Sequence, residues 1–277
     1  MLRIETMMTH QKILGLGIGL SLTAVGCDLG ADGATAAQMR QAMDEVALTG
    51  EAQGLEDGIV EITTSFTIGA GVEAIVAEVR EFAQSQAPCS TVESPEPGTL
   101  VIDFGTLDDA CEYRGKTYAG VATVAFEVAD DAVLVRHTYA GITNGRVTLD
   151  GEAHVTWQDR SRRVETDFTF VGENGTLEVE SDRTQTPLGG LGDGIEVVGT
   201  RDWTSASGSW ALDIVDVQMR AIDPVPQAGS YSLTTPREHV LGLSFERVDD
   251  DTIEVTMTGG RRDRVFHVTS IGEVEDE

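Results

Sequence analysis

The residues that most often carry catalysis are few and scattered in this chain. After His10, the histidines are His137, His154, His239 and His267, and none has a second histidine at metal-ligand spacing. The sequence contains no His-Glu-x-x-His run and no Gly-x-Ser-x-Gly nucleophile elbow. We expect each histidine to be an ordinary surface or half-buried residue. The sequence therefore favours a protein without catalysis and without a cofactor.

Acidic clusters are the next candidates for chemistry. Asp249, Asp250 and Asp251 lie between two predicted strands and could bind calcium with Glu246 or Glu254. The regular carboxylate spacing and central glycine of a dedicated calcium loop are missing. An exposed acidic turn is the favoured interpretation, with the three aspartates as weak metal candidates.

Aromatic side chains are the usual platforms for sugars and apolar ligands, but they make up only 5% of this chain. Trp157, Trp203 and Trp210 are the candidate ligand-binding residues. Packing in the core or on a sheet face is the alternative for all three. A hydrolase of envelope polymers would need two facing carboxyl groups beside one of these tryptophans.

The overall charge restricts the partners. Asp and Glu number 47 against 19 Lys and Arg, which gives a formal net charge of -28. Such a field repels phosphate backbones and anionic lipid headgroups. We expect no nucleic-acid partner.

The N-terminus has the pattern of an export signal. Arg3 and Lys12 supply positive charge before an apolar stretch, Ile13–Val25. This stretch has the length expected of a signal peptide and is too short to span a bilayer as a helix. At the end of this stretch, Ala24-Val25-Gly26-Cys27 resembles the lipobox of bacterial lipoproteins. That resemblance implies cleavage after Gly26 and attachment of fatty acids such as palmitate to Cys27. The mature protein is then expected in the cell envelope, anchored to the inner or outer membrane and facing the periplasm or the cell surface.

The remaining cysteines form a pair. With Cys27 lipidated, Cys89 and Cys111 are left over in an oxidising compartment, where a disulfide is expected.

The hydrophobic pattern predicts a mainly β fold with two short N-terminal helices. Thr35 can cap a helix over Ala36–Leu48, and Val72–Gln86 has a second helical stripe. Between them, Gly50–Gly58 is expected to be a loop and Ile59–Ile68 a strand rich in β-branched residues. Further strands are expected near 100–104, 121–128, 132–142, 147–158, 164–171, 176–184, 195–203, 208–218, 240–247, 252–258 and 264–269.

Strict alternation of apolar and polar residues over 147–158 predicts a sheet with one buried and one wet face. Short connections between strands predict a large curved antiparallel meander, either an open sheet or a half-barrel. The expected organisation is a signal peptide (1–26), a flexible tether (27–35) and one β-rich domain (36–277). A C-terminal hairpin subunit over 230–269 is expected to pack on the main sheet.

One further resemblance concerns the body of the chain. Thr99–Gly105, Cys111 and Gly115–Gly120 are similar to segments of uncharacterised bacterial lipoproteins built of repeated β-hairpins. That group implies a fold but no activity.

Three functions remain open at this point. The leading hypothesis is a lipid-anchored envelope protein with a structural or partner-binding role. The second is a periplasmic carrier of lipid or another apolar ligand, whose half-open barrel would be lined by Phe168, Phe170, Trp210, Leu212 and Ile214 around an unfilled cavity. The third is the envelope-polymer hydrolase.

Overall fold

The computed structural model describes residues 33–67, 69–172, 175–189, 194–220, 223, 225–269 and 274–276. The predicted signal peptide, Cys27 and most of the predicted tether lie outside these residues. No helix in the described part of the chain is both long and apolar enough to span a membrane.

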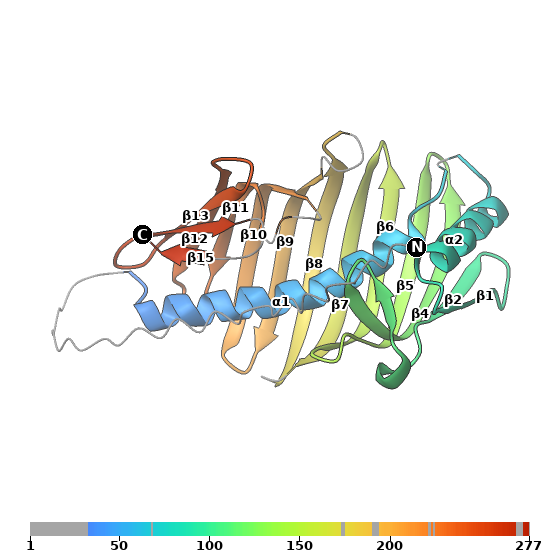
Figure 1. Cartoon of the computed structure of the whole chain (residues 1–277), viewed down its shortest axis with the longest axis horizontal. Coiled ribbons are helices and arrows are strands. Elements are labelled where there is room, and N and C mark those ends of the chain that lie inside the picture. Colours follow the sequence, from blue (N-terminus) through green and yellow to red (C-terminus); the bar gives the residue numbers. More distant parts are fainter. Residues whose placement is uncertain are drawn as a thin grey trace, which may run out of the picture.

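The molecule is mainly β, as predicted, and its strands form one open antiparallel sheet (Figure 1). Hydrogen-bonded neighbours follow the order β1-β2-β4-β5-β6-β7-β8-β9-β10-β11-β12-β13-β14-β15, and β3 pairs with β4 beside this path. The first half comprises β1 (Thr91–Glu93), β2 (Thr99–Asp103), β3 (Cys111–Tyr113), β4 (Lys116–Ala129), β5 (Ala132–Thr143), β6 (Thr148–Gln158) and β7 (Ser161–Gly172). The second half comprises β8 (Gly175–Pro187), β9 (Ile195–Ser205), β10 (Gly208–Met219), β11 (Ala228–Thr234), β12 (Val240–Arg247), β13 (Thr252–Thr258), β14 (Arg264–Thr269) and β15 (Val274–Asp276).

Two α-helices precede the sheet, as predicted. Helix α1 (Ala36–Thr63) runs across the strands along one face of the sheet, and α2 (Val72–Gln86) lies at the end formed by β1, β2 and β4 (Figure 1). Thr35 caps α1 as expected, because its hydroxyl accepts a hydrogen bond from the Gln38 backbone and the Gln38 side chain binds back to Thr35.

The predictions between the two helices were wrong. Gly50–Gly58 is not a loop and the segment from Ile59 is not a strand, because α1 continues through both as far as Thr63. The β-branched residues Ile59, Val60 and Ile62 are fully buried between the sheet and α2. Burial of these side chains therefore outweighs their preference for strands.

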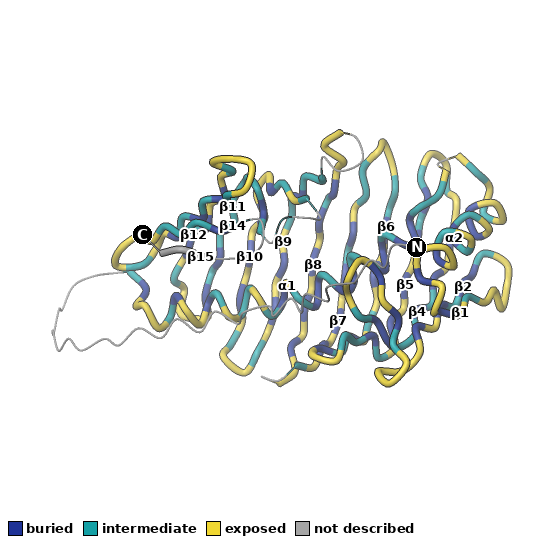
Figure 2. The backbone as a smooth tube through the Cα atoms, in the orientation of Figure 1, coloured by how far each residue is buried: buried dark blue, intermediate teal, exposed yellow. Residues whose placement is uncertain are grey.

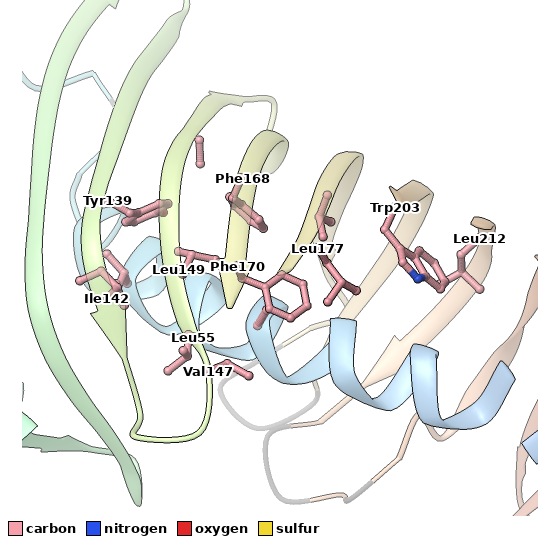
Figure 3. Close-up of a cluster of buried hydrophobic side chains, with 14 of the residues drawn as sticks. Leu55, Tyr139, Ile142, Val147, Leu149, Phe168, Phe170, Leu177, Trp203 and Leu212 are labelled. Atoms are coloured by element: carbon pink, nitrogen blue, oxygen red, sulfur yellow. The ribbon is translucent and has the colours of Figure 1, made fainter. Parts of the chain in front are cut away.

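The core lies on the face of the sheet that α1 covers, which we call the inner face. Buried and exposed residues alternate along the strands (Figure 2), so every second side chain points to that face. Phe168, Phe170 and Leu177 project from β7 and β8 on the side of the sheet where α1 lies, and they share one buried cluster with Leu55 of α1 (Figure 3). A second cluster, which includes Val79, fills the space under α2.

The C-terminal strands extend the same sheet. β11 pairs with β10 over Ala211↔Thr234 to Gln218↔Ala228, and β12 to β14 follow edge to edge. Their buried side chains form a third hydrophobic cluster, Leu243, Phe245, Ile253, Val255 and Val268.

Candidate functional site

Helix α1 turns a polar stripe toward the sheet, beside the apolar side chains, such as Leu55 and Ile59, that it also buries there. The residues of the stripe are spaced by three, four or seven positions, and two of the positions are occupied by adjacent pairs. This spacing places them on one side of the helix. They are Glu45, Thr49, Gln53, Glu56, Asp57, Thr63 and Thr64. We call these residues and their partners on the inner face the polar seam.

The centre of the polar seam is a buried ion-pair cluster. Arg183 on β8 is 2% exposed, and its Nη2 lies 2.7 Å from Glu56 Oε2. Its Nη1 lies 3.1 Å from Asp57 Oδ1, and the Gln185 amide donates to the same oxygen over 3.2 Å. One guanidinium thus joins two neighbouring carboxyl groups of α1 to the middle of the sheet.

The pKa values of the two carboxyl groups shift in opposite directions. Complete burial raises the pKa of Glu56 to about 7, although the charge of Arg183 opposes the shift. For Asp57, burial is outweighed by Arg183 and Arg162, whose charges lower its pKa below the ordinary value. Asp57 also keeps 38% of its side chain exposed, which favours the ionised form. The pKa shifts of the two carboxyl groups thus have opposite signs, so Glu56 holds a proton more readily than Asp57 does.

Toward the C-terminus of α1, the seam contains a histidine. His137 on β5 is fully buried, and its Nε2 lies 2.6 Å from Thr63 Oγ1. Burial lowers the pKa of His137 to about 3, so the imidazole is neutral at physiological pH. The expectation that each histidine is a surface or half-buried residue was therefore wrong for His137. Next to it, Arg162 donates to Thr64 Oγ1 over 2.9 Å and to Gln185 Oε1 over 2.6 Å.

At the other end, the seam includes two of the three tryptophans. The rings of Trp203 and Trp210 stack with centroids 5.9 Å apart and planes 3° from parallel. Trp203 Nε1 donates to Glu45 Oε2 over 3.0 Å, and Trp210 Nε1 donates to Ser207 Oγ over 3.0 Å. Both rings are at most 4% exposed, so they pack under α1.

Trp157 does not join them. It lies on β6 and packs, partly buried, against the cluster under α2. The three candidate ligand-binding tryptophans thus do not form one platform.

The acidic candidates for a metal lie elsewhere. Asp249, Asp250 and Asp251 form the turn between β12 and β13, where Asp249 Oδ1 accepts the Asp251 backbone N–H over 2.9 Å. Arg247 donates to the Asp250 carbonyl over 3.1 Å. Among the described residues, no group of three or more acidic, histidine or cysteine side chains has the arrangement of a metal site.

The predicted disulfide is confirmed. Cys89 and Cys111 are bonded with their Cα atoms 5.5 Å apart, and the bond ties the segment after α2 to β3. Cys27, the predicted lipidation site, lies outside the described residues.

The apolar residues considered for a ligand cavity are covered. Phe168, Phe170, Trp210, Leu212 and Ile214 do line the inner face, and each is at most 5% exposed. All five belong to the cluster that also contains Leu55 and Ile59 of α1. In this structure, α1 occupies the position that a carried ligand would need.

Sequence reasoning missed the polar seam. Arg162, Arg183 and Arg201 occupy inward positions of β7, β8 and β9, in phase with apolar residues of the same strands. Charged residues at core positions were one available signal. The spacing of Glu45, Thr49 and Gln53 by four residues was a second signal. It indicates a polar side of a helix only if Gly50–Gly58 is assigned to that helix.

Comparisons of the chain with models of known protein families, with curated proteins and with solved structures found no match.

Proposed function

We propose that this chain is a lipid-anchored protein of the cell envelope with a structural or partner-binding role and no catalysis. The observation that carries the proposal is the position of α1. The helix closes the inner face through the polar seam and leaves the other face of the sheet, the outer face, open to solvent. The surface available to a partner is thus the outer face.

The outer face has an unusual charge arrangement. Glu152, Asp167, Glu180 and Asp202 are directly opposite one another on β6, β7, β8 and β9. All four are exposed. Like charges in directly opposed positions destabilise a sheet, so the arrangement does not serve the fold. A surface used by something outside the chain accounts for it better.

The anchor is supported by two observations. The lipobox-like Ala24-Val25-Gly26-Cys27 provides the attachment site, and the Cys89–Cys111 disulfide is typical of exported proteins. Several acyl chains on Cys27 would hold the sheet at the surface of a bilayer.

The two alternative functions have less support. A lipid carrier needs free apolar space on the inner face, where α1 lies. A hydrolase needs two facing carboxyl groups beside a tryptophan in an open cleft. The neighbouring carboxyl groups of the polar seam, Glu56 and Asp57, instead bind Arg183 beneath α1.

Site-specific crosslinking in the native envelope tests this function. A photo-crosslinking residue replaces the exposed Thr169 or Thr204 on the outer face, and, as a control, Asp108 in the turn before β3. We expect one envelope protein to be captured from positions 169 and 204 and not from 108. Capture that is equal at all three positions, or absent at the outer face, would contradict the proposal.

A further inference from the structure

The sign of the surface charge reverses at one corner of the sheet. Arg237 lies in the connection between β11 and β12, and Arg261, Arg262 and Arg264 lie at the connection between β13 and β14. All four are exposed, and we call them the arginine edge. Glu238 and Asp263 are the acidic residues within these two connections, so four positive charges face two negative ones in a chain of net charge -28.

The two connections lie at the same end of the sheet. β12 is antiparallel to both β11 and β13, so the chain leaves β11 and β13 at one end of the strands. The backbone of Gly259, at the start of the second connection, lies against Val240, which follows the first. The arginine edge is therefore one surface rather than two separate loops.

The guanidinium groups of the arginine edge have no acidic partner among the residues that the structure describes. Within the described part of the chain, none of the four forms an ion pair or a side-chain hydrogen bond, whereas nearby Arg247 and Arg220 both bind Asp223. Val240, beside Arg237, is 57% exposed. An unpaired cationic rim next to an exposed apolar side chain has the composition of a surface that meets lipid headgroups.

The anchored end of the chain enters the structure at this corner. Ala34 forms a parallel bridge with Gly260: its N–H donates to Gly259 O over 3.1 Å, and its carbonyl accepts from Arg261 N–H over 3.3 Å. The start of α1 lies beside the C-terminal strands (Figure 1). Seven residue steps separate Cys27 from Ala34, which span at most about 25 Å when fully extended. Acyl chains on Cys27 would hold the arginine edge within that distance of the bilayer.

We propose that the arginine edge contacts the anionic phosphate headgroups of the membrane in which Cys27 is anchored, and so orients the sheet. The inference rests on the lipid anchor of the proposed function. Arginine binds phosphate oxygens in a bidentate manner. Asp202, at the end of the acidic row, pairs with Ala211 of β10, which pairs with Thr234 of β11, so it lies two strand spacings, about 10 Å, from the edge. The acidic row therefore weakens this attraction little, because charges farther apart than about 8 Å are largely screened at physiological ionic strength. The repulsion of anionic lipids expected from the whole-chain charge therefore does not apply at this corner.

Protease protection on vesicles tests the proposal. The lipidated full-length protein is reconstituted on neutral phosphatidylcholine vesicles and on vesicles that also contain phosphatidylglycerol, and tryptic cleavage after Arg261 and Arg262 is followed. We expect phosphatidylglycerol to slow this cleavage about tenfold, the effect of roughly 1.4 kcal/mol of added attraction. Cleavage after Arg160, in the exposed turn between β6 and β7, serves as the internal control and should not change.

Two variants separate the arginine edge from other causes of protection. Arg237→Gln with Arg264→Gln keeps both cleavage sites but should abolish their protection. Arg114→Gln with Arg146→Gln, exposed positions outside the edge, should leave the protection intact. Equal cleavage rates on neutral and anionic vesicles would overturn the proposal, as would protection that survives the first variant.

Flotation distinguishes failure of the anchor from failure of the arginine edge. If the protein floats with neutral vesicles but gains no protection from phosphatidylglycerol, the lipid anchor is present and the proposed contact of the arginine edge with headgroups is contradicted. If the protein floats only with anionic vesicles and is protected there, the lipid anchor is contradicted and the contact of the arginine edge with headgroups is supported.

Discussion

Arg183 joins two carboxyl groups of α1 to the sheet. It is 2% exposed and compensates the charge of two carboxyl groups of the helix. Arg183→Met would leave Glu56 and Asp57 without their cation, and removal of one partner from a buried ion pair costs about 3–5 kcal/mol of stability. Urea unfolding monitored by circular dichroism measures the loss.

An exposed arginine on the outer face provides the control for Arg183→Met. Arg163 on β7 forms a bidentate pair with Asp182, the residue before Arg183, and the two side chains are 51% and 49% exposed. Arg163→Gln should leave stability nearly unchanged, because exposed ion pairs contribute little. Equal losses in the two variants would show that the buried cluster has no special role.

The polar seam also predicts how stability changes with pH. The folded pKa of Glu56, about 7, is above its unfolded value of 4.5, so the folded state binds more protons between these values. Its contribution therefore decreases as pH rises from about 4.5 to 7. His137 acts in the opposite direction, because its folded pKa of about 3 is below its unfolded value of 6.5. Its contribution increases as pH rises from about 3 to 6.5.

The contributions of Glu56 and His137 oppose each other, so the unfolding free energy of the wild type should change little with pH where both groups titrate. Glu56→Gln removes one of the two contributions. We expect the variant to gain stability more steeply than the wild type as pH rises from about 4.5 to 7. Unfolding free energies at pH 5, 6 and 7 provide the comparison. Parallel profiles for the two proteins would mean that Glu56 titrates normally in the folded state.

At the scale of elements, the glycines of α1 show which side of the helix faces the sheet. Gly50 has no atom within 4 Å of an added methyl group, whereas at Gly58 that group would collide with the hydroxyl of buried Tyr118. Gly50→Ala should stabilise the protein by about 0.5–1 kcal/mol through helix propensity. Gly58→Ala should destabilise it by about 1–3 kcal/mol through overpacking. Thermal unfolding of the pair tests both signs, and gains in both variants would contradict the docked position of α1.

The disulfide fixes the connection between α2 and the sheet. Cys89 and Cys111 are 22 residues apart, and a loop of this size contributes about 3 kcal/mol in the chain-entropy model. Replacing both cysteines by serine should lower the unfolding free energy by that amount without changing the far-ultraviolet dichroism. A loss of β signal would instead show that the bond is required for folding.

The sequence predicts the strands better than it predicts α1, and the reason is physical. In β6, alternation of side chains is a local pattern that needs one buried face. In α1, the pattern is governed by partners distant in sequence, since Glu56 and Arg183 are 127 positions apart. Gly50, Gly54 and Gly58 also lower helix propensity, so local signals pointed to a loop. In the candidate site, the tryptophans and cysteines were recognised from the sequence. The arginine partners were missed, although they lie in phase with the apolar residues of their strands.

The whole molecule has two faces with different roles. α1 and the polar seam fill the inner face, and the outer face presents a row of acidic side chains from β6 to β9. The arginine edge lies where the chain comes from Cys27, so membrane attachment and partner binding would use different parts of the sheet. This division of roles between the two faces depends on the inner face being filled by the chain itself.

Native mass spectrometry of the protein purified from its own envelope tests that dependence most directly. The predicted mass is that of residues 27–277 with one disulfide and covalent acyl groups on Cys27, and it should be the same after denaturation. An additional stoichiometric mass that dissociates on denaturation would reveal a carried ligand on the inner face and contradict the account.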